Sequence, residues 1–213
     1  TDALMVINNQ VGQLGISINM KKNIKNQSNM KTINYNNNNG LAKWVSIFLL
    51  CMISIVSYSQ VSVTATAGTV GPTAYTTLGA ALAAINSGTH QGVISVAISA
   101  NTAEAATAFL NASGAGSASY TSVSIRPSAD GIIVQGAPTS SQCLVLLNGA
   151  DNVTIDGDNP NTSGTNRNLT FRNTLASTLL TGNAVIRLGS APSPGSGADN
   201  ITIRNCIIKG ISN

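Results

Sequence analysis

A short phrase that recurs between residues 151 and 210 constrains the fold of this chain more than any other feature. The three copies read DNVTIDG from Asp151, RNLTFRN from Arg167 and DNITIRN from Asp199. Their asparagines stand at positions 152, 168 and 200, so the two intervals are 16 and 32 residues, the second twice the first. Such regularity is typical of an architecture that stacks similar units on one another.

Each copy of the phrase predicts a β-strand, because apolar residues alternate with threonine. In the first copy Val153 and Ile155 would face one way and Thr154 the other. An asparagine precedes each strand and a glycine or asparagine follows it, which suits the turns at both ends. In a parallel stack, equivalent residues lie about 4.8 Å apart, so the asparagines can form a hydrogen-bonded ladder. A spacing of 16 is short for a three-sided unit, so the copies also fit successive faces.

The residues before the repeat also favour strands. Alternation predicts strands at residues 61–67, 91–99, 122–126, 131–135 and 143–147, with residues 102–118 as a small-residue loop containing one Ala-rich turn. Residues 75–86 differ, because Leu78, Leu82 and Ile85 have helical spacing, with a threonine as N-cap and Asn86-Ser-Gly88 as a stop. We expect this helix to cover the open end of a strand stack. The predicted class is therefore all-β.

Charge separates an amino-terminal leader from the rest. The formal net charge is +4 at pH 7, but five lysines and Asp2 account for all of it before residue 60. Beyond residue 60, six basic residues balance six acidic ones. No basic patch that could follow a phosphate backbone remains, so nucleic acid is excluded as a partner.

The leader contains the pattern of a secretory signal peptide. Residues 44–56 read WVSIFLLCMISIV, a short apolar run that follows Lys31 and Lys43 and precedes small residues. As a helix this run rises only about 20 Å, too short for a bilayer core of about 30 Å, so we expect no stable membrane span. Residues 1–29 are interpreted as an upstream disordered leader and residues 30–59 as the signal peptide, cleaved after Ser59. Residues 60–74 then form a linker and first strand.

The exported part resembles a known family. The segments YTTLGAALAAINSGTHQGVISVAIS, SVSIRPSADG, LVLLNGADNVTIDG and NLTFRN are similar to the right-handed parallel β-helix (pectin-lyase-like) domain of large bacterial cell-surface proteins exported by type IX secretion. The resemblance implies a capping helix at residues 75–90 and a parallel β-helix, or solenoid, over residues 91–213 that is incomplete at its carboxyl end. Since this superfamily contains adhesins and stalks as well as enzymes, the resemblance does not fix an activity.

The best candidate site consists of Asp151, Asp156 and Asp158, with Asn159 and Asn161 beside them. Crowded carboxylate and amide oxygens suit a hard cation, so calcium is the candidate cofactor. Lyases of the superfamily combine calcium with a basic residue, a role open here to Arg172, Arg187 or Arg204. The competing interpretation is charge pairing between strands, because the phrase position of Asp156 holds Arg172 and Arg204 in the other copies.

The remaining reactive side chains fit no motif. His90 is the single histidine, outside any metal or triad signature, and is interpreted as a loop residue. Cys143 and Cys206 each begin an apolar strand and are predicted to be free, buried thiols.

The sequence thus favours a secreted or cell-surface β-helical segment of a larger protein, structural or adhesin-like, without catalysis in these residues. Extracellular polysaccharide or other cell-surface components are the expected partners. The alternative is the amino-terminal part of a polysaccharide lyase or glycoside hydrolase whose groove lies on later coils.

Overall fold

The computed structural model describes residues 3–10, 13–20, 59–139, 143–176, 183–190 and 197–210. The chain divides into two compact units, Thr1–Val56 and Ser57–Asn213. In the first unit, β1 (Ala3–Gln10) and β2 (Gln13–Met20) pair antiparallel. The sequence predicted a disordered leader here, but segments rich in Val, Ile and Leu have strand propensity that its many asparagines and lysines obscure. The predicted signal peptide, up to Tyr58, lies outside the described residues.

The second unit is built mainly from β-strands. Its elements are β3 (Val61–Gly68), β4 (Thr73–Tyr75), α2 (Leu78–Asn86), β5 (His90–Ile98), β6 (Thr102–Glu104), β7 (Ala108–Asn111), β8 (Tyr120–Pro127), β9 (Ile132–Gly136), β10 (Cys143–Asn148), β11 (Val153–Asp156), β12 (Leu169–Asn173), β13 (Ala184–Gly189), β14 (Thr202–Arg204) and β15 (Cys206–Lys209). The predicted all-β class is confirmed. No helix in the described part of the chain has the length and apolarity needed to cross a membrane.

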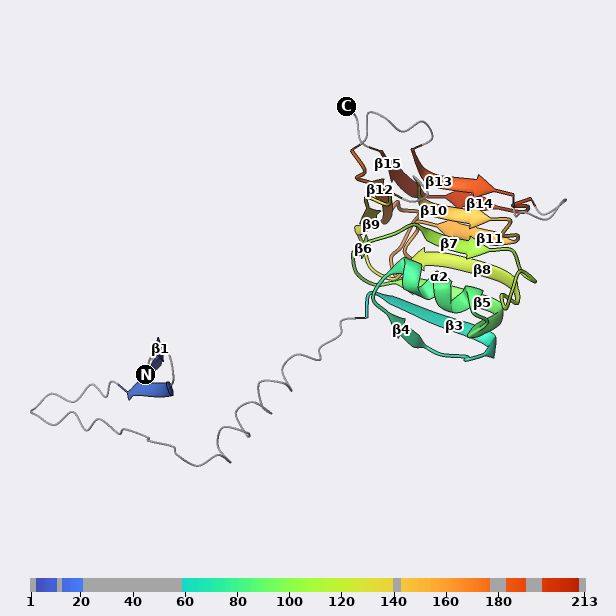
Figure 1. Cartoon of the computed structure of the whole chain (residues 1–213). Helices are drawn as coiled ribbons and strands as arrows, with labels where there is room; N and C mark the ends of the chain where they lie inside the picture. Colours follow the sequence, from blue (N-terminus) through green and yellow to red (C-terminus); the bar gives the residue numbers. More distant parts are fainter. Residues whose placement is uncertain are drawn as a thin grey trace, which may run out of the picture. The chain divides into compact units, whose positions relative to one another are not determined.

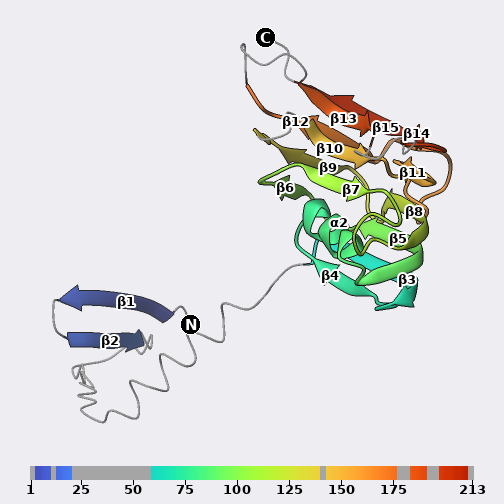
Figure 2. The same cartoon turned by 45° about the vertical axis from the view of Figure 1, so that its right-hand side comes forward.

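These strands form three sheets. The six-stranded sheet has the order β14-β11-β8-β5-β3-β4, the four-stranded sheet β15-β12-β9-β6, and the three-stranded sheet β13-β10-β7. From β5 onward the chain visits the six-, four- and three-stranded sheets in turn, and each such round is called a circuit below. From β8 on, each strand pairs in parallel with the strand three places earlier, so circuits lie one above another (Figures 1 and 2).

The repeated phrase follows this rotation. Its first and third copies lie in β11 and β14, which pair in parallel with Thr154 opposite Thr202. The second copy lies in β12, on the next sheet. Asn152 and Asn200 are therefore one circuit apart, 48 residues along the chain, and the Asn200 Nδ2 donates to the Asn152 Oδ1 at 3.2 Å. Both have φ of 56°, the left-handed conformation that asparagine tolerates.

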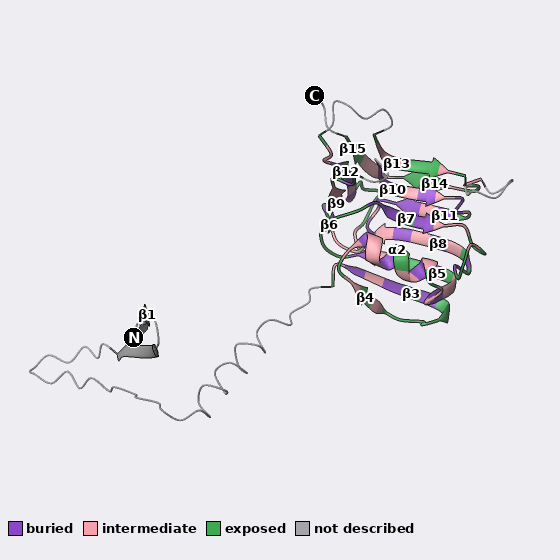
Figure 3. Cartoon of the chain, viewed as in Figure 1, coloured by how far each residue is buried: buried purple, intermediate pink, exposed green. Residues whose placement is uncertain are grey.

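The core lies between the sheets. Val96, Ile125 and Ile155 occupy equivalent positions in three successive circuits and are fully buried. Phe171 lies opposite Val134 in the four-stranded sheet and is also fully buried. Every strand from β5 to β12 carries buried residues, many of them visible in Figure 3, whereas β13 carries none. Alternation along each strand is what gives every circuit one apolar side.

Two details of the first circuit differ from the sequence prediction. Residues 102–118, predicted as a loop with an Ala-rich turn, contain β6 and β7. These strands have only three and four residues, so their alternation is too short to recognise. Tyr75 belongs to β4, because the helix begins only at Leu78, after Thr77 caps it by accepting from the Ala80 amide.

Helix α2 lies against the first circuit and buries Leu78, Leu82 and Ile85. The carboxylate of Glu104, at the end of β6, accepts from the Leu78 and Gly79 amides, each at 2.9 Å. At the other end of α2, the Asn86 side chain donates to the Phe109 carbonyl and accepts from the Asn111 amide, both at 2.9 Å.

The Asn86 side-chain amide thus offers β7 the donor and the acceptor that a neighbouring strand would supply. In this way helix α2 provides hydrogen-bond partners for the outer edge of β7, which has no strand of an earlier circuit beside it.

Replacing Glu104 should separate the helix from the first circuit. Glu104→Ala leaves the buried Leu78 amide and the half-buried Gly79 amide without their charged acceptor, and we expect a loss of about 2 kcal/mol in the free energy of unfolding. Glu104→Gln keeps one acceptor oxygen and should lose less. Urea denaturation measures both, and equal stability of the alanine variant and the parent would contradict the role given to Glu104.

Replacing Asn152 should weaken the contact between circuits. Asn152→Ala removes the side-chain bond to Asn200 and puts alanine in a left-handed conformation, so we expect a loss of about 1–2 kcal/mol. Asn152→Gly should recover part of it, because glycine adopts this conformation freely. Asn168→Ala, at the same phrase position without the left-handed backbone, is the control. Thermal melting that ranks Asn168→Ala as the more damaging change would refute this account.

Candidate functional site

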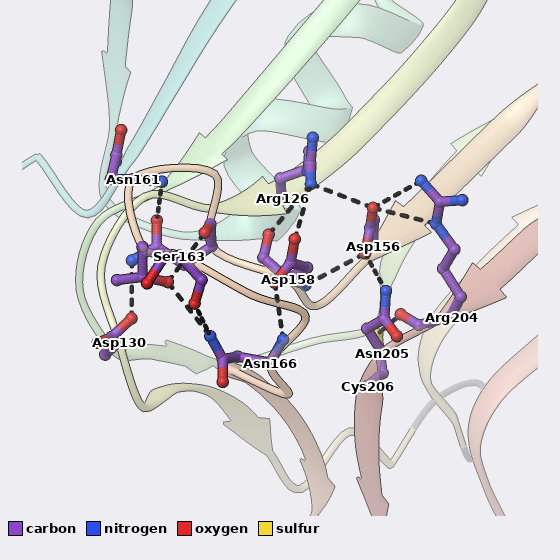
Figure 4. Close-up of polar contacts among 12 residues, drawn as sticks. Arg126, Asp130, Asp156, Asp158, Asn161, Ser163, Asn166, Arg204, Asn205 and Cys206 are labelled. Carbon is purple, nitrogen blue, oxygen red and sulfur yellow. Dashed lines mark hydrogen bonds and ion pairs between the residues drawn. The ribbon is translucent and has the colours of Figure 1, made fainter.

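A column of charged side chains crosses the six-stranded sheet and forms the best candidate site. Arg126 lies on β8, Asp156 on β11 and Arg204 on β14. Asp156 pairs directly with Arg204, and the pairing of Ile125 with Ile155 puts Arg126 beside Asp156 on the other side. Since Ile125 and Ile155 face the core, the three charged residues face outward. We call them the charged column (Figure 4).

Both oxygens of Asp156 are occupied. The Oδ2 accepts from Arg204 Nε at 3.0 Å and Nη2 at 2.9 Å, and Arg126 Nη2 lies 3.2 Å away. The Oδ1 accepts from Asn205 Nδ2 at 2.9 Å and from the Asp158 amide at 3.2 Å. The side chain is 2% exposed. These contacts leave little room for a further ligand on this carboxylate.

The same contacts set the protonation of Asp156. Burial alone would raise its pKa, but the hydrogen bonds from Asn205, the Asp158 amide and Arg204, with the charge of Arg126, outweigh burial. The pKa of Asp156 is therefore lowered from its ordinary value of 3.8. The residue is a stable anion between two cations, and not a proton-transfer group that titrates near neutral pH.

The loop after β11 packs against the charged column. The Asp158 Oδ1 accepts from the Asn166 amide at 2.8 Å, and its Oδ2 lies 3.6 Å from Arg126 Nη2. Asn159 donates to Asp130 Oδ1 at 2.7 Å. The loop is thus tied to the circuit below it through its polar side chains, as Figure 4 shows.

Of the three predicted metal ligands, the structure brings two together. Asp156 and Asp158 meet at Arg126, whereas Asp151 lies at the opposite end of β11, where its Oδ1 accepts from the Asp199 amide at 2.7 Å. Within the described ranges, no three His, Cys, Asp or Glu residues are grouped as metal ligands. Calcium binding by Asp151, Asp156 and Asp158 stays a prediction.

The arginines divide between the sheets. Arg204 contacts Asp156, as charge pairing predicted, but Arg172 lies on the four-stranded sheet between Gln135 and Lys209, and Arg187 on the three-stranded sheet opposite Leu146.

Sequence reasoning missed Arg126. A signal was present, because VSIR at 123–126 has the same order of apolar, hydroxyl, apolar and charged residues as VTID at 153–156 and ITIR at 201–204.

His90 was predicted to be a loop residue, and this prediction is wrong. It is the first residue of β5 and is fully buried. Its Nδ1 lies 2.6 Å from the Thr69 carbonyl and its Nε2 2.8 Å from the Tyr75 hydroxyl. The carbonyl can only accept, so Nδ1 donates to it. The ring therefore joins the turn after β3 to β4 and β5.

The two described cysteines are free, in agreement with the prediction. Cys143 is fully buried, and burial raises the pKa of its thiol. Cys206 is half-buried, and burial, together with the charge of Asp156, outweighs a hydrogen bond from the Gly157 amide and raises its pKa to about 11. Neither thiol is activated as a nucleophile.

Comparison of the chain with protein-family models, with curated proteins and with solved structures gives no match. The site is therefore interpreted from its own geometry.

The lowered pKa of Asp156 predicts an acid-sensitive contribution to stability. Asp156→Asn removes the anion from between two arginines, and we expect a loss of about 2 kcal/mol at neutral pH. A folded pKa below the unfolded one gives stability that is present above the ordinary value and is lost as pH falls toward the lowered one. The stability difference between parent and variant should therefore be constant from about pH 8 to pH 5 and shrink below about pH 4.

Urea denaturation across this pH range measures the difference. Arg172→Ala is the matched control, since it removes an exposed arginine from the same phrase position and should change stability by less than about 0.5 kcal/mol. A difference that persists undiminished at pH 3 would contradict the assignment.

Proposed function

We propose that residues 91–213 form a right-handed parallel β-helix, capped by α2, that serves as a structural or adhesin-like segment of an exported cell-surface protein. One observation carries the proposal: the chain rotates through three sheets, and each strand pairs in parallel with its equivalent one circuit earlier. Connected parallel strands that recur in this order suit a continuous helical winding of the backbone. The right-handed sense follows from the strong preference of parallel crossovers.

The polar side chains of the repeat support a structural role. Asp156 joins β8, β11 and β14 through two arginines. Asn148 Nδ2 donates to Asn111 Oδ1 at 3.1 Å, so asparagines of successive circuits also pair on the three-stranded sheet. These groups would be the natural candidates for binding or catalysis, and here they hold one circuit to the next. Such contacts fit a rigid spacer better than a reaction site.

The outer face of the six-stranded sheet supports a role in contact with extracellular material. Its central positions form a row of hydroxyl side chains in pairing register, one on each of five neighbouring strands: Thr64, Ser95, Ser124, Thr154 and Thr202. A regular row of small hydroxyl groups can hydrogen-bond to a polysaccharide or to another surface component without a deep cleft. We propose this face as the one that meets such partners.

The leader supports export. The second compact unit starts at Ser57 and its first strand at Val61, close to the predicted cleavage after Ser59. Removal of the signal peptide would therefore leave the strands of this unit intact. The surface location and type IX export rest on the leader pattern and on the family resemblance described above.

Expression of the intact gene in a Gram-negative host with type IX secretion tests the proposal. We expect the mature protein to begin at Gln60 and to be accessible to antibody and protease on intact cells. Interrupting the apolar run at residues 44–56 with Leu50→Lys should prevent export, so the protein should stay inside the cell. Turnover of a pectin or alginate panel that disappears in Asp156→Asn, with the variant still folded, would favour the lyase alternative and overturn the structural role.

A further inference from the structure

The predicted cleavage after Ser59 makes a glutamine the first residue of the mature chain, and the fold holds this residue in the six-stranded sheet. Gln60 is half-buried and comes directly before β3. Its backbone amide donates to the Tyr75 carbonyl at 3.1 Å, and its carbonyl accepts from the Ser99 amide at 2.8 Å. These two bonds extend the pairing of β3 with β4 and β5 by one residue, so Gln60 is part of the sheet.

The fold leaves no spare residue ahead of the core at this position. Val61 directly follows Gln60, is fully buried, and lies opposite Tyr75 and Ile98. Removal of Gln60 by an aminopeptidase would take away the acceptor of the Ser99 amide. It would also put the charged terminal amine on a fully buried residue. A mature chain that starts at Gln60 therefore depends on keeping that residue.

A free amino terminus fits this position poorly. A terminal α-amine is largely protonated at neutral pH and then has three N–H donors. The fold offers the Gln60 nitrogen one acceptor, the neutral Tyr75 carbonyl. Among the contacts of the described residues, no carboxylate is bonded to Gln60. A half-buried cation without a carboxylate partner is unfavourable, and a neutral terminus with a single N–H avoids that cost.

The glutamine side chain can itself produce such a terminus. Attack of the α-amine on the side-chain Cδ closes a five-membered lactam ring, because Cα, Cβ and Cγ separate the two atoms. The N–Cδ bond forms, the Cδ–Nε2 bond breaks, and one proton passes from the α-amine to the leaving nitrogen, which departs as ammonia. The step needs no oxidant, cofactor or second substrate. The product is uncharged, keeps one N–H and lacks the free amine that aminopeptidases recognise.

We propose that Gln60 of the mature exported protein is converted to pyroglutamate. The modification removes the charge from a half-buried terminus and protects the residue that accepts from the Ser99 amide. Cyclisation follows cleavage, because it requires the free α-amine. This inference rests on the cleavage after Ser59 that belongs to the proposed export, but not on adhesion or on the parallel β-helix.

Mass spectrometry of the exported protein tests the proposal. The whole chain is expressed in the exporting host, and a protease that cuts after Tyr75 releases the peptide 60–75 from freshly harvested secreted material. We expect nearly all of this peptide to be lighter than the unmodified peptide by the mass of one ammonia molecule. Gln60 carries the only side-chain carboxamide in residues 60–75, so the loss is assigned to it. A synthetic peptide with a free glutamine, taken through the same digestion, controls for cyclisation during handling.

Gln60→Asn is the matched variant. Asparagine keeps a carboxamide that is one carbon shorter, so attack by its α-amine would require a strained four-membered ring. The exported variant should therefore begin with a free amine and have its full unmodified mass. In the presence of an aminopeptidase, the variant should lose residue 60 while the parent keeps it, and equal loss from both would overturn the protective role.

The outcomes separate this inference from the proposed export. An exported parent chain that begins with an unmodified Gln60, or that is cleaved at another bond, would overturn the pyroglutamate and leave export intact. Loss of ammonia from the Gln60→Asn terminus would overturn it as well. A chain that stays in the cell with its leader attached would overturn the proposed export and this inference with it.

Discussion

Parallel pairing of each strand with its equivalent one circuit earlier is the interaction on which this structure depends. Because the pairing is in register, every side chain lies directly above its counterpart, about 4.8 Å away. Apolar residues then form continuous buried columns, as Val96, Ile125 and Ile155 do. Outward residues meet their equivalents in the same way, so like charges in one column would repel. The alternation Arg126, Asp156, Arg204 is the arrangement that avoids this repulsion on the six-stranded sheet.

The same constraint creates a difficulty at the first circuit, whose strands have no earlier circuit to pair with. At the beginning of the stack, β3 and β4 extend the six-stranded sheet in antiparallel orientation, and α2 covers the first circuit. Glu104 fixes the start of that helix, which leaves no space for a side chain at Gly79, since a Cβ there would lie 2.9 Å from its carboxylate. A specific set of contacts therefore replaces a missing strand.

The sequence predicted much of this fold because the information is local. Alternation located β5, β8 and β10, and a threonine N-cap with three spaced apolar residues located α2, whose cap is Thr77 in the structure. Alternation could not reveal β6 and β7, because these strands are too short. It also could not show that Asn152 stacks with Asn200, on the paired strands β11 and β14, and not with Asn168. The number of residues in a circuit depends on its loops, whose lengths vary. The regular 16- and 32-residue intervals between the copies of the phrase therefore do not give the circuit length.

The candidate site was harder to predict, because pairing between circuits decides which residues meet. Asp156 was singled out as a calcium ligand because of its acidic neighbours, whereas the partners it contacts, Arg126 and Arg204, lie 30 residues before it and 48 after it. Because both oxygens of the Asp156 carboxylate are bound by these partners, the carboxylate helps to fix the pairing register of β8, β11 and β14. A shift of β8 or β14 by two residues would leave this buried anion facing threonine or serine in place of arginine. That penalty gives this buried charged group a structural role in a chain of which only 8% of the residues are charged.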